Sequence, residues 1–450
     1  MGSNEVQFDS LNELLAEKKY KVLAMELQEY NEVDIATFLD ELEPEQVLVL
    51  FRMLPKDLSA EVFSEMEIDT QTRIVESFSA PELNAIVENL AMDDAVDMIE
   101  ELPANLVKKV LQSATMDTRK TINQYLKYPE NSAGSIMTAE YVALKKWMNV
   151  GQALQYIREH GVDSETIYTC YVTNVQRELE GVITLKDLVM SAPDINVEDL
   201  MDDNVISAYT TEDQEEIATT FNKYDLLALP VVDLENRVVG IITVDDMVDV
   251  MEQEATEDIQ KMAAMTPSEK PYLSTSVFEL ARNRIFWLLF LMISSMLTGY
   301  LLTKYEDAFA AVPLLVSFIP MMTGTGGNAG SQSSTLVIRG MTIGEIRPRD
   351  VLKVWWKEIR VAVLCGVVLA AVNFLRLMIQ YPGNNMVCLT VVLSMFGTIV
   401  IAKSIGCMLP IAAKLLHLDP AIMAAPLIST IVDACSLLLY FQIACVLIGL

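Results

Sequence analysis

Hydrophobic positions follow different patterns in successive parts of the chain, and each pattern predicts a different kind of structure. From residue 11 to about residue 130, short segments carry one apolar stripe each and are separated by turn residues such as Leu54-Pro55. Short helices with a single apolar stripe must stack on their neighbours to bury it. We therefore expect an all-α, superhelical N-terminal domain over residues 1–130.

The middle of the chain contains β-rich apolar runs that repeat. Residues Gly181–Val189 and Gly240–Val248 share Gly, Ile, Thr, Asp and Val in register, 59 residues apart. Each run predicts a strand that leads into a helix capped by its Thr. This repeat resembles a pair of cystathionine β-synthase-type (CBS) domains, which implies two α/β modules over residues 131–200 and 201–250. In that family Asp187 and Asp246 would lie where a nucleotide ribose binds; the structural alternative is a simple strand-to-helix turn.

An acidic segment follows the second repeat. Seven carboxylates lie between positions 245 and 258, and no proline occurs before Pro267. Like charges at this density destabilise a helix unless cations screen them. Residues 251–272 are therefore expected to form an acidic connecting (plug) helix whose position depends on divalent ions. The alternative is an ordinary solvated linker helix.

The last part of the chain, residues 273–450, reads as a transmembrane domain of five helices. The five apolar spans cover about 281–303, 311–336, 358–380, 386–413 and 420–449. Basic residues gather in alternate loops, so the positive-inside rule places the N-terminal domains in the cytoplasm and the C-terminus outside the cell (plasma or inner) membrane. Residues 1–10 contain no apolar run, so no secretory signal is expected.

The second span is unusual because residues 323–334 are mostly small or polar. Gly326 and Gly330 form a GxxxG pair, which predicts close packing against another helix. The same small residues would expose backbone carbonyls, and Asn328 would offer an amide oxygen, as in the wall of a pore. The two interpretations are compatible.

Asp433 is the only charged residue between Pro420 and Leu450. A charge held deep in a bilayer costs about 3 kcal/mol or more unless water, a cation or a partner meets it. We interpret Asp433 as a carboxylate that faces a cation. The alternative is a protonated carboxylic acid bonded to a neighbouring helix.

Charge is distributed very unevenly along the chain. Residues 1–270 hold 54 acidic and 20 basic side chains, whereas residues 271–450 hold 8 and 12. A polyanionic soluble part argues against nucleic acid as a partner and favours cations, although a merely soluble acidic surface has the same composition. Asp93 and Asp97 lie four residues apart on one helical face. They are either a solvated face or half of a divalent-cation site.

Three motifs give the chain a specific resemblance. They are Pro271-Tyr272-Leu273, the segment from Thr325 to Ser334 followed by Arg339-Gly340, and Leu418-Asp419-Pro420 through to Asp433. With them the chain resembles the MgtE family of magnesium channels and transporters over nearly its whole length.

The resemblance implies a homodimer in the lipid bilayer with one pore on its axis, lined by spans two and five of both subunits. It implies that Asp433 recruits magnesium and that Ser429, one turn earlier, supplies a backbone carbonyl. It also maps magnesium-sensing carboxylates onto Glu61, Asp93, Asp97, Asp213, Glu215, Asp225, Asp246, Asp249, Glu254, Glu257, Asp258 and Asp419.

The resulting hypothesis is a Mg²⁺-selective channel or transporter that closes when Mg²⁺ binds its acidic cytosolic domains, with ATP or another adenine nucleotide as an optional ligand of the CBS pair. Two alternatives stay open: a membrane Mg²⁺ sensor that does not transport, and a transporter of other divalent cations such as Co²⁺, Mn²⁺ and Ni²⁺. An enzyme is not expected. An intramembrane aspartyl protease needs two facing aspartates, and the sequence has no Walker-type loop. A lone pore carboxylate would repel anions, which argues against an anion channel.

Overall fold

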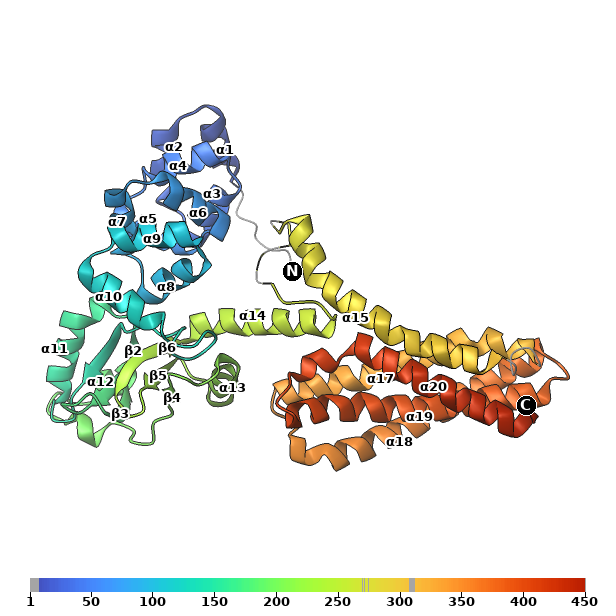
Figure 1. The fold of residues 1–450 in the computed structure, drawn as a ribbon. Helices are drawn as coiled ribbons and strands as arrows, with labels where there is room; N and C mark the ends of the chain where they lie inside the picture. Colours follow the sequence, from blue (N-terminus) through green and yellow to red (C-terminus); the bar gives the residue numbers. More distant parts are fainter. Residues whose placement is uncertain (1–7, 269, 271, 274, 307–311, 450) are drawn as a thin grey trace. The chain divides into compact units, whose positions relative to one another are not determined.

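The computed structural model describes residues 8–268, 270, 272–273, 275–306 and 312–449 (Figure 1). It divides into two compact units, Met1–Val250 and Met251–Leu450. Helix α14 (Val244–Met262) begins in the first unit and ends in the second. Pro271 of the family motif, residues 1–7 and Leu450 at the expected outer end lie outside the described residues.

The described N-terminal part of the first unit consists of short helices of eight to ten residues. They are α1 (Asp9–Ala16), α2 (Tyr20–Leu27), α3 (Glu32–Asp40), α4 (Pro44–Phe51), α5 (Lys56–Ser64), α6 (Ile68–Ser77), α7 (Ala80–Val87), α8 (Met92–Glu101), α9 (Ala104–Ser113) and α10 (Met116–Tyr125). Helices two positions apart in the chain pack together: α3 on α5, α5 on α7, and α7 on α9. Phe51 is buried between Phe63 and Phe78, with ring centroids 6.1 and 5.8 Å away. The expected stack of amphipathic helices is confirmed.

The two repeats fold in the same order. The first contains β1 (Tyr141–Leu144), α11 (Val150–His160), β2 (Thr166–Thr173), β3 (Leu179–Thr184) and α12 (Leu185–Met190). The second contains β4 (Ala208–Tyr209), α13 (Gln214–Tyr224), β5 (Ala228–Val232), β6 (Val238–Thr243) and α14. The sheet orders are β1-β2-β3 and β4-β5-β6, and in each sheet the first pair is parallel and the second antiparallel.

Both strand-to-helix turns form as the repeat predicted. Thr184 caps α12, and its counterpart Thr243 donates its hydroxyl hydrogen bond to Asp246. The glycine that opens each repeat is explained by close backbone approach. A Cβ on Gly181 would lie 3.1 Å from the carbonyl oxygen of Asp202, and a Cβ on Gly240 would lie 2.7 Å from that of Thr138.

The second unit is built from long helices. They are α15 (Val277–Lys304), α17 (Ile319–Thr342), α18 (Val351–Gln380), α19 (Asn385–Leu415) and α20 (Ala425–Ile448). Within the described residues, α15, α18, α19 and α20 are the four helices long and apolar enough to cross a membrane. The fifth expected span, α17, is 24 residues long, but its small and polar residues make it less apolar.

Two of the expected spans begin later than the hydrophobic pattern indicated. Pro313–Phe318 and Pro420–Met423 form 3₁₀ turns, η3 and η5, before α17 and α20 respectively. Each of these helices has a proline in its first turn, Pro320 and Pro426, where a missing backbone N–H is tolerated. The difference arises because a run of apolar residues shows which segment is buried but does not show at which residue its helix begins.

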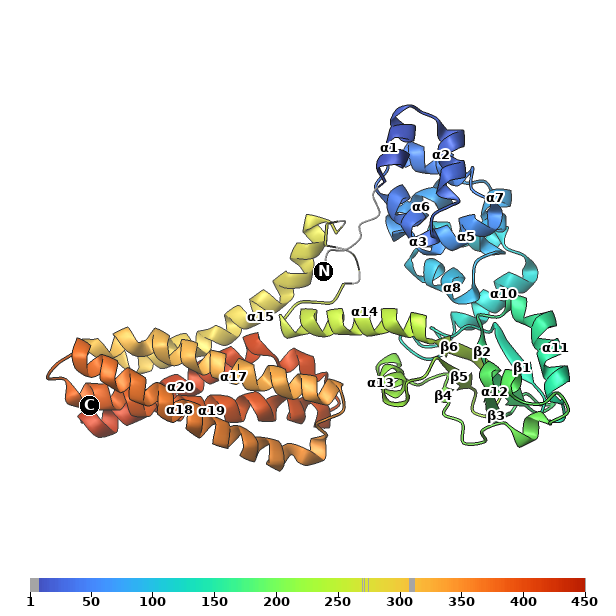
Figure 2. The same ribbon diagram turned by 180° about the vertical axis from the view of Figure 1, so that it is seen from behind.

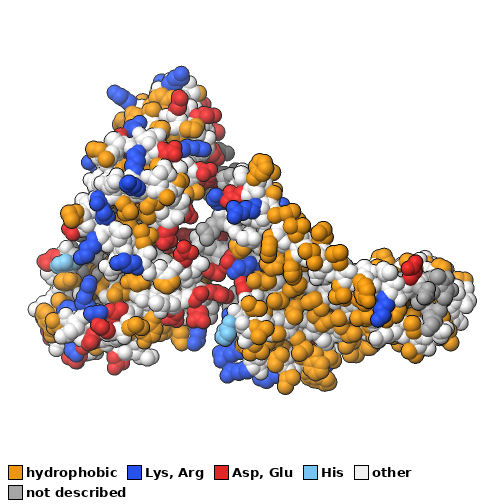
Figure 3. Space-filling model, in the orientation of Figure 1, with side chains coloured by type: hydrophobic (Ala, Val, Ile, Leu, Met, Phe, Trp, Pro, Cys, Tyr) orange, Lys and Arg blue, Asp and Glu red, His pale blue; other side chains and the backbone are white. Residues whose placement is uncertain are grey.

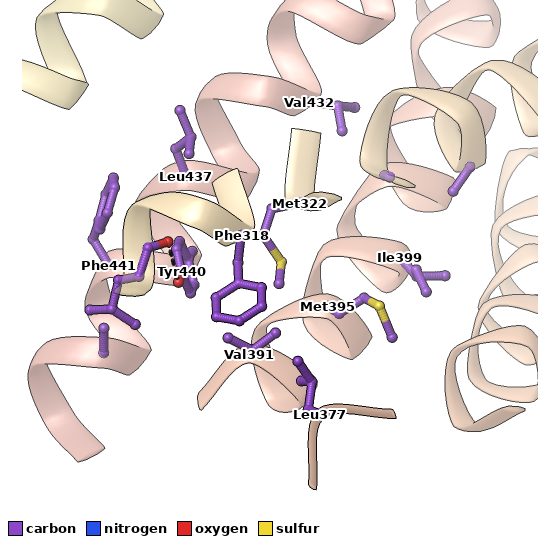
Figure 4. Packing of buried hydrophobic residues seen from close by; sticks show 14 of the residues in the cluster. Phe318, Met322, Leu377, Val391, Met395, Ile399, Val432, Leu437, Tyr440 and Phe441 are labelled. Carbon is purple, nitrogen blue, oxygen red and sulfur yellow. Dashed lines mark hydrogen bonds between the residues drawn. The ribbon is translucent and has the colours of Figure 1, made fainter. Parts of the chain in front are cut away.

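Helices α17, α18, α19 and α20 lie side by side in both ribbon views (Figures 1 and 2). Their shared core contains Phe318 from η3, Met322 from α17, Met395 from α19 and Tyr440 from α20 (Figure 4). The hydroxyl of Tyr440 donates a hydrogen bond to the backbone carbonyl of Leu315, at 2.9 Å. This bond satisfies the buried hydroxyl and ties the turn before α17 to α20.

The outer surface of this unit is largely apolar. Hydrophobic side chains cover most of the face seen in the space-filling view, and α15 exposes large side chains such as Phe278, Phe286 and Tyr300 (Figure 3). Exposed apolar area of this extent on long helices is typical of contact with lipid.

Candidate functional site

One face of α17 packs tightly against its neighbours. Gly326 and Gly330 are both buried, and a Cβ on Gly326 would lie 2.8 Å from Val432 Cγ1 of α20. Gly330 also meets α19, where a Cβ on Gly406 would overlap the Gly330 carbonyl. These contacts leave no room for a methyl group, so the close packing predicted from the GxxxG pair is confirmed.

The opposite face of α17 is polar and uncovered. Gly324, Asn328, Gln332 and Thr335 are all exposed, at the three- and four-residue spacing of one helical face. The glycine face and the Asn328 face are therefore separate. The structure brings the small residues against α19 and α20 and leaves the amide of Asn328 on the open side.

Asp433 lies in α20, one turn after Ser429. Ser429 is in contact with α17, since a Cβ on Gly327 would lie 3.1 Å from its Oγ. Asp433 is half-buried. Within the described ranges, no group forms a hydrogen bond or an ion pair with its carboxylate. Among the described residues, therefore, no neighbouring helix provides the hydrogen-bond partner that a protonated Asp433 would need under the alternative interpretation.

A buried polar network connects three helices of the same unit. Ser333 of α17 donates a hydrogen bond to Glu358 Oε2 of α18 at 2.6 Å, and Lys403 Nζ of α19 donates to Ser333 Oγ at 3.2 Å. Lys403 Nζ is 3.6 Å from Glu358 Oε2, and the two charged side chains are only 7% and 13% exposed. The motifs in the sequence did not predict this network. Lys403 is nevertheless a charged residue inside an apolar span, as Asp433 is, and this position was a signal for it.

The end of α14 forms an ion-pair cluster with the turn that precedes α20. Lys261 Nζ is 2.7 Å from Glu257 Oε1 and 2.7 Å from Asp419 Oδ2. Asp419 also caps η5 by accepting a hydrogen bond from the Ala421 N–H. Burial alone would lower the pKa of Lys261, but its bonds to Asp419 and Glu257 outweigh that and raise it. Of the predicted carboxylates, Glu257 and Asp419 thus share an internal cation.

Asp258 lies at the same end of α14. Its carboxylate accepts a hydrogen bond from the Thr342 hydroxyl at 3.4 Å. Burial, and then repulsion by Asp419, raise the pKa of Asp258 above its usual range. The carboxylates here carry more negative charge than the single ammonium of Lys261 neutralises.

A second group of carboxylates lies in the first unit, and acidic side chains are prominent on that unit in the space-filling view (Figure 3). We call Asp93, Asp94 and Asp97 of α8 together with Asp246 of α14 the acidic cluster. Burial raises the pKa of Asp93 to about 6, with further repulsion from Glu165. Burial also raises the pKa of Asp246 to about 6, despite the hydrogen bond from Thr243 and with added repulsion from Asp93.

The carboxyl pKa values of the other two members of the acidic cluster are raised further. Burial raises the pKa of Asp94 to about 7, and repulsion by Asp93 and Asp246 adds to it. The pKa of Asp97 is also raised to about 7, by burial and then by Asp93 and Asp94. Helix α8 therefore places Asp93 and Asp94 beside Asp246, a residue far away in the sequence, whereas Asp97 interacts with Asp93 and Asp94 within the helix. Groups of this kind bind either protons or cations when the pH is near neutral.

The remaining predicted residues have other surroundings. Asp213 caps α13 by accepting a hydrogen bond from the Glu215 N–H at 2.9 Å, and Asp225 ends that helix in the left-handed conformation with φ of 50°. Glu61 is exposed on α5. Glu215, Asp249 and Glu254 each take part in interactions of their own. Across the described residues, no group of three or more His, Cys, Asp or Glu side chains has an arrangement that could hold a metal ion.

Comparison with known proteins gives the family. Residues 319–443 match the MgtE model, described as a divalent cation transporter, and residues 30–131 match the MgtE intracellular N domain. Residues 133–194 and 197–253 each match the CBS domain. The magnesium transporter MgtE of Thermus thermophilus is 35% identical over 440 residues, which cover 97% of each chain. This chain belongs to the MgtE family.

Other relatives agree with that assignment. The magnesium transporter MgtE of Bacillus subtilis is 33% identical over 427 residues, covering 91% of this chain and 93% of that protein. A crystal structure of the cytosolic domain of the Mg²⁺ channel MgtE in complex with ATP matches with a TM-score of 0.51 and 36% identity, over 54% of this chain and 98% of that one. The soluble part of a magnesium transporter matches with a TM-score of 0.53 and 29% identity, over 56% and 99%.

Family membership confirms the resemblance that the three sequence motifs carried, and it confirms the expected fold class of an MgtE N domain, a CBS pair and a helical membrane part. With its apolar helices, this MgtE-family chain is a multi-pass membrane protein.

Proposed function

We propose that this MgtE-family chain transports Mg²⁺ across a cell membrane, along a path bordered by α17 and α20. The observation that carries the proposal is the half-buried carboxylate of Asp433, which has no protein partner among the described residues and lies on an apolar helix beside Gly-rich α17. Mg²⁺ gives up its water reluctantly, so a pore must attract a largely hydrated ion by charge and outer-shell hydrogen bonds. Asp433 supplies the charge; Asn328 and the Ser429 carbonyl supply polar groups.

The transporting assembly is a homodimer. The polar face of α17 is exposed in the single chain, and such a face is unfavourable against lipid. A second copy related by a two-fold axis would place two such faces and two Asp433 carboxylates around one path. This arrangement would give the hydrated cation a water-filled route with paired negative charge.

The proposed organisation follows the sequence divisions. Residues 1–130 form the N-terminal domain, 131–200 and 201–250 the two CBS domains, 251–272 the connecting segment, and 273–450 the transmembrane domain. The helix of the connecting segment is shorter than the sequence predicted, because α14 ends at Met262. The N-terminal domains lie in the cytoplasm and the C-terminus lies outside. The chain acts as a transporter and not as an enzyme, in line with the names of its relatives.

Cytosolic Mg²⁺ closes the path. The acidic cluster and the carboxylates at the end of α14 are crowded enough to raise one another's pKa, so a divalent cation would relieve their repulsion. Moving a gate from about 1:99 to 99:1 requires about 5.5 kcal/mol of differential binding. Several weak sites, each favouring the closed form by about 1 kcal/mol, supply this and give a cooperative response.

The CBS pair is also proposed to bind an adenine nucleotide such as ATP. The support is the ATP complex of the related cytosolic domain. In this chain Asp187 completes the cap of α12 and Asp246 accepts from Thr243, so both have a structural role in addition to any contact with a ribose.

Flux through the purified protein in liposomes tests the transport proposal. Mg²⁺ entry should be detected by an internal dye and should persist with equimolar Ca²⁺, Mn²⁺, Co²⁺ or Ni²⁺ outside. Protein that inserts and folds but passes no Mg²⁺ would favour a sensor that does not transport. Equal competition by all these ions would favour the broader divalent-cation transporter that the family description names.

A separate experiment tests the gate. Neutralising Asp246, Asp249, Glu254, Glu257 and Asp258 together, or deleting residues 1–130, should leave flux that responds less to cytosolic Mg²⁺. Limited proteolysis of α14 should show protection at millimolar Mg²⁺ in the native chain. If neither proteolysis nor flux responds to Mg²⁺, the proposal that cytosolic Mg²⁺ closes the path is refuted, whereas the transport proposal is unaffected.

A further inference from the structure

The network of Ser333, Glu358 and Lys403 contains the most deeply buried ion pair among the described residues of the second unit. The ion pair joins α18 to α19, and Ser333 is the group that connects α17 to both charges. Its hydroxyl donates to Glu358 at 2.6 Å, with the Ala329 carbonyl of α17 as a more distant acceptor at 3.4 Å, and it accepts from Lys403, so both of its hydrogen-bonding roles are used. The serine side chain is therefore fixed in orientation by two charged partners on two different helices.

A buried ion pair is a poor way to gain stability. The desolvation of both charges offsets most of their attraction, and well-packed hydrophobic residues of similar size often do as well. Buried polar groups are better attested as devices that fix the register of packed helices. An ionisable group inside a membrane segment is also costly enough that a role beyond packing is the default expectation.

Register matters for α17 because its two faces differ. Ser333 lies on the packed face with Gly326 and Gly330, whereas Asn328 lies on the open face. Each residue of an α-helix turns the chain by about 100°. A rotation of α17 by one residue would therefore bring Asn328 toward α19 and α20 and bring a buried small residue to the open side.

We propose that Ser333, Glu358 and Lys403 are positioning residues that fix the rotation of α17, and so hold Asn328 on the side that faces the permeating ion. This inference rests on the proposed function, because it assigns Asn328 to the path. The neighbouring Ser334 is a matched control. It is equally buried, but it donates to a backbone carbonyl, that of Met423, at 3.1 Å, and does not touch the ion pair.

Thiol labelling in the full-length protein reads the rotation directly. Asn328→Cys should react with a charged, membrane-impermeant thiosulfonate, and Ala329→Cys, which is buried, should not. Adding Ser333→Ala should reduce the ratio of the two labelling rates by about threefold or more, the effect of one interhelical hydrogen bond. Adding Ser334→Ala should leave the ratio closer to its native value. The unlabelled parent protein, with its own cysteines, supplies the background rate.

Two outcomes of labelling are decisive in different ways. An unchanged ratio with Ser333→Ala would overturn the positioning role alone. No labelling at position 328 in the otherwise native chain would contradict the assignment of Asn328 to the path and would overturn this inference with it. Neither outcome depends on measured Mg²⁺ flux, so loss of flux in the native protein identifies failure of the proposed function separately.

The ion pair is tested by variants that keep the unit folded. Single changes such as Glu358→Gln leave one charge buried without its partner and are expected to lower the folded yield. The double variant Glu358→Gln/Lys403→Met removes both charges; it should fold, yet show reduced Mg²⁺-over-Ca²⁺ selectivity and the same altered labelling ratio. The exchanged pair Glu358→Lys/Lys403→Glu should recover selectivity. A double-neutral variant with native selectivity and native labelling would show that the pair only packs.

Discussion

Replacing Lys261 by methionine would remove the internal cation from the end of α14 and keep a side chain of similar length. Lys261 lies 2.7 Å from both Glu257 and Asp419, and its side chain is 22% exposed, with that of Asp419 28% exposed. Only the pair with Asp419 joins α14 to the turn before α20, because Glu257 lies on α14 itself; this one partly buried pair contributes about 1 kcal/mol to that contact. Without Mg²⁺, the variant should therefore shift the equilibrium by roughly 5-fold toward a form in which the end of α14 has left that turn.

Mg²⁺ should act on this variant in the opposite direction. The carboxylates of Glu257, Asp258 and Asp419 lose their ammonium partner, so a divalent cation no longer has to displace it. The expected result is higher flux without cytosolic Mg²⁺, together with half-inhibition at a lower Mg²⁺ concentration than in the native chain. The assay is liposome flux across a series of Mg²⁺ concentrations on the cytosolic side.

A matched control is Lys270→Met. Lys270 pairs with Glu279 at 3.1 Å, but its side chain is 53% exposed, so its contribution should be small. This control should keep the native Mg²⁺ response. Two results would refute this reasoning: half-inhibition of Lys261→Met at a higher Mg²⁺ concentration than in the native chain, or unchanged flux without Mg²⁺. Either would show that Lys261 does not compete with Mg²⁺ for these carboxylates.

Two further results are expected. Asn328→Leu should lower Mg²⁺ flux at normal expression, and unchanged flux in this variant would place α17 away from the path. Gly326→Leu should lower thermal stability as well as flux. A Cβ at position 326 would lie 2.8 Å from Val432 Cγ1, and overpacking of this kind costs about 1–3 kcal/mol. The acidic cluster makes α8 pH-sensitive. Its raised pKa values mean that stabilisation by protonation is complete below the usual carboxyl pKa and is lost as the pH rises through about 6 to 7. Without divalent ions, hydrogen-exchange protection of α8 in the full-length protein should therefore increase from pH 7.5 to pH 5, after correction for intrinsic exchange. Millimolar Mg²⁺ should flatten this dependence. Without Mg²⁺, lower protection at pH 5 than at pH 7.5 would contradict the prediction.

Features coded by local sequence were predictable. The two repeats gave the strand-to-helix turns at Thr184 and Thr243, because the alternation of apolar residues and the capping threonine are close together in the chain. The small residues of α17 gave its close packing, because a helix contact at Gly326 and Gly330 depends on side-chain size at a four-residue spacing. Such signals need no knowledge of which helix is the partner.

Contacts between distant segments were not predictable from spacing. The pairing of Lys261 with Asp419 brings the end of α14 to the turn before α20, and the sequence of neither segment identifies the other as its partner. The acidic cluster similarly joins α8 to Asp246, which only the fold of the first unit determines. Family resemblance supplied these residues as a set of carboxylates, but it gave no sign that a lysine lies among them.

The network around Lys403 was missed although a signal existed. Lys403 is a charge inside an apolar span and is subject to the same cost that drew attention to Asp433. Glu358 stands at the edge of its span, where a charge usually reaches the membrane surface. The structure shows that it turns inward instead and pairs with Lys403. A charged residue within an apolar span therefore predicts a partner group on another helix.

The most direct test of the central claim is Mg²⁺ flux through reconstituted Asp433→Asn protein. A carboxylate attracts a divalent cation about 5 Å away by roughly 1.7 kcal/mol even at the dielectric constant of water, and by more in a narrow pore. Loss of this charge from each subunit should reduce flux by at least about tenfold in protein that remains folded, and Asp433→Glu should retain part of the native flux. Native flux through well-folded Asp433→Asn protein would contradict the assignment of Asp433 to the ion path.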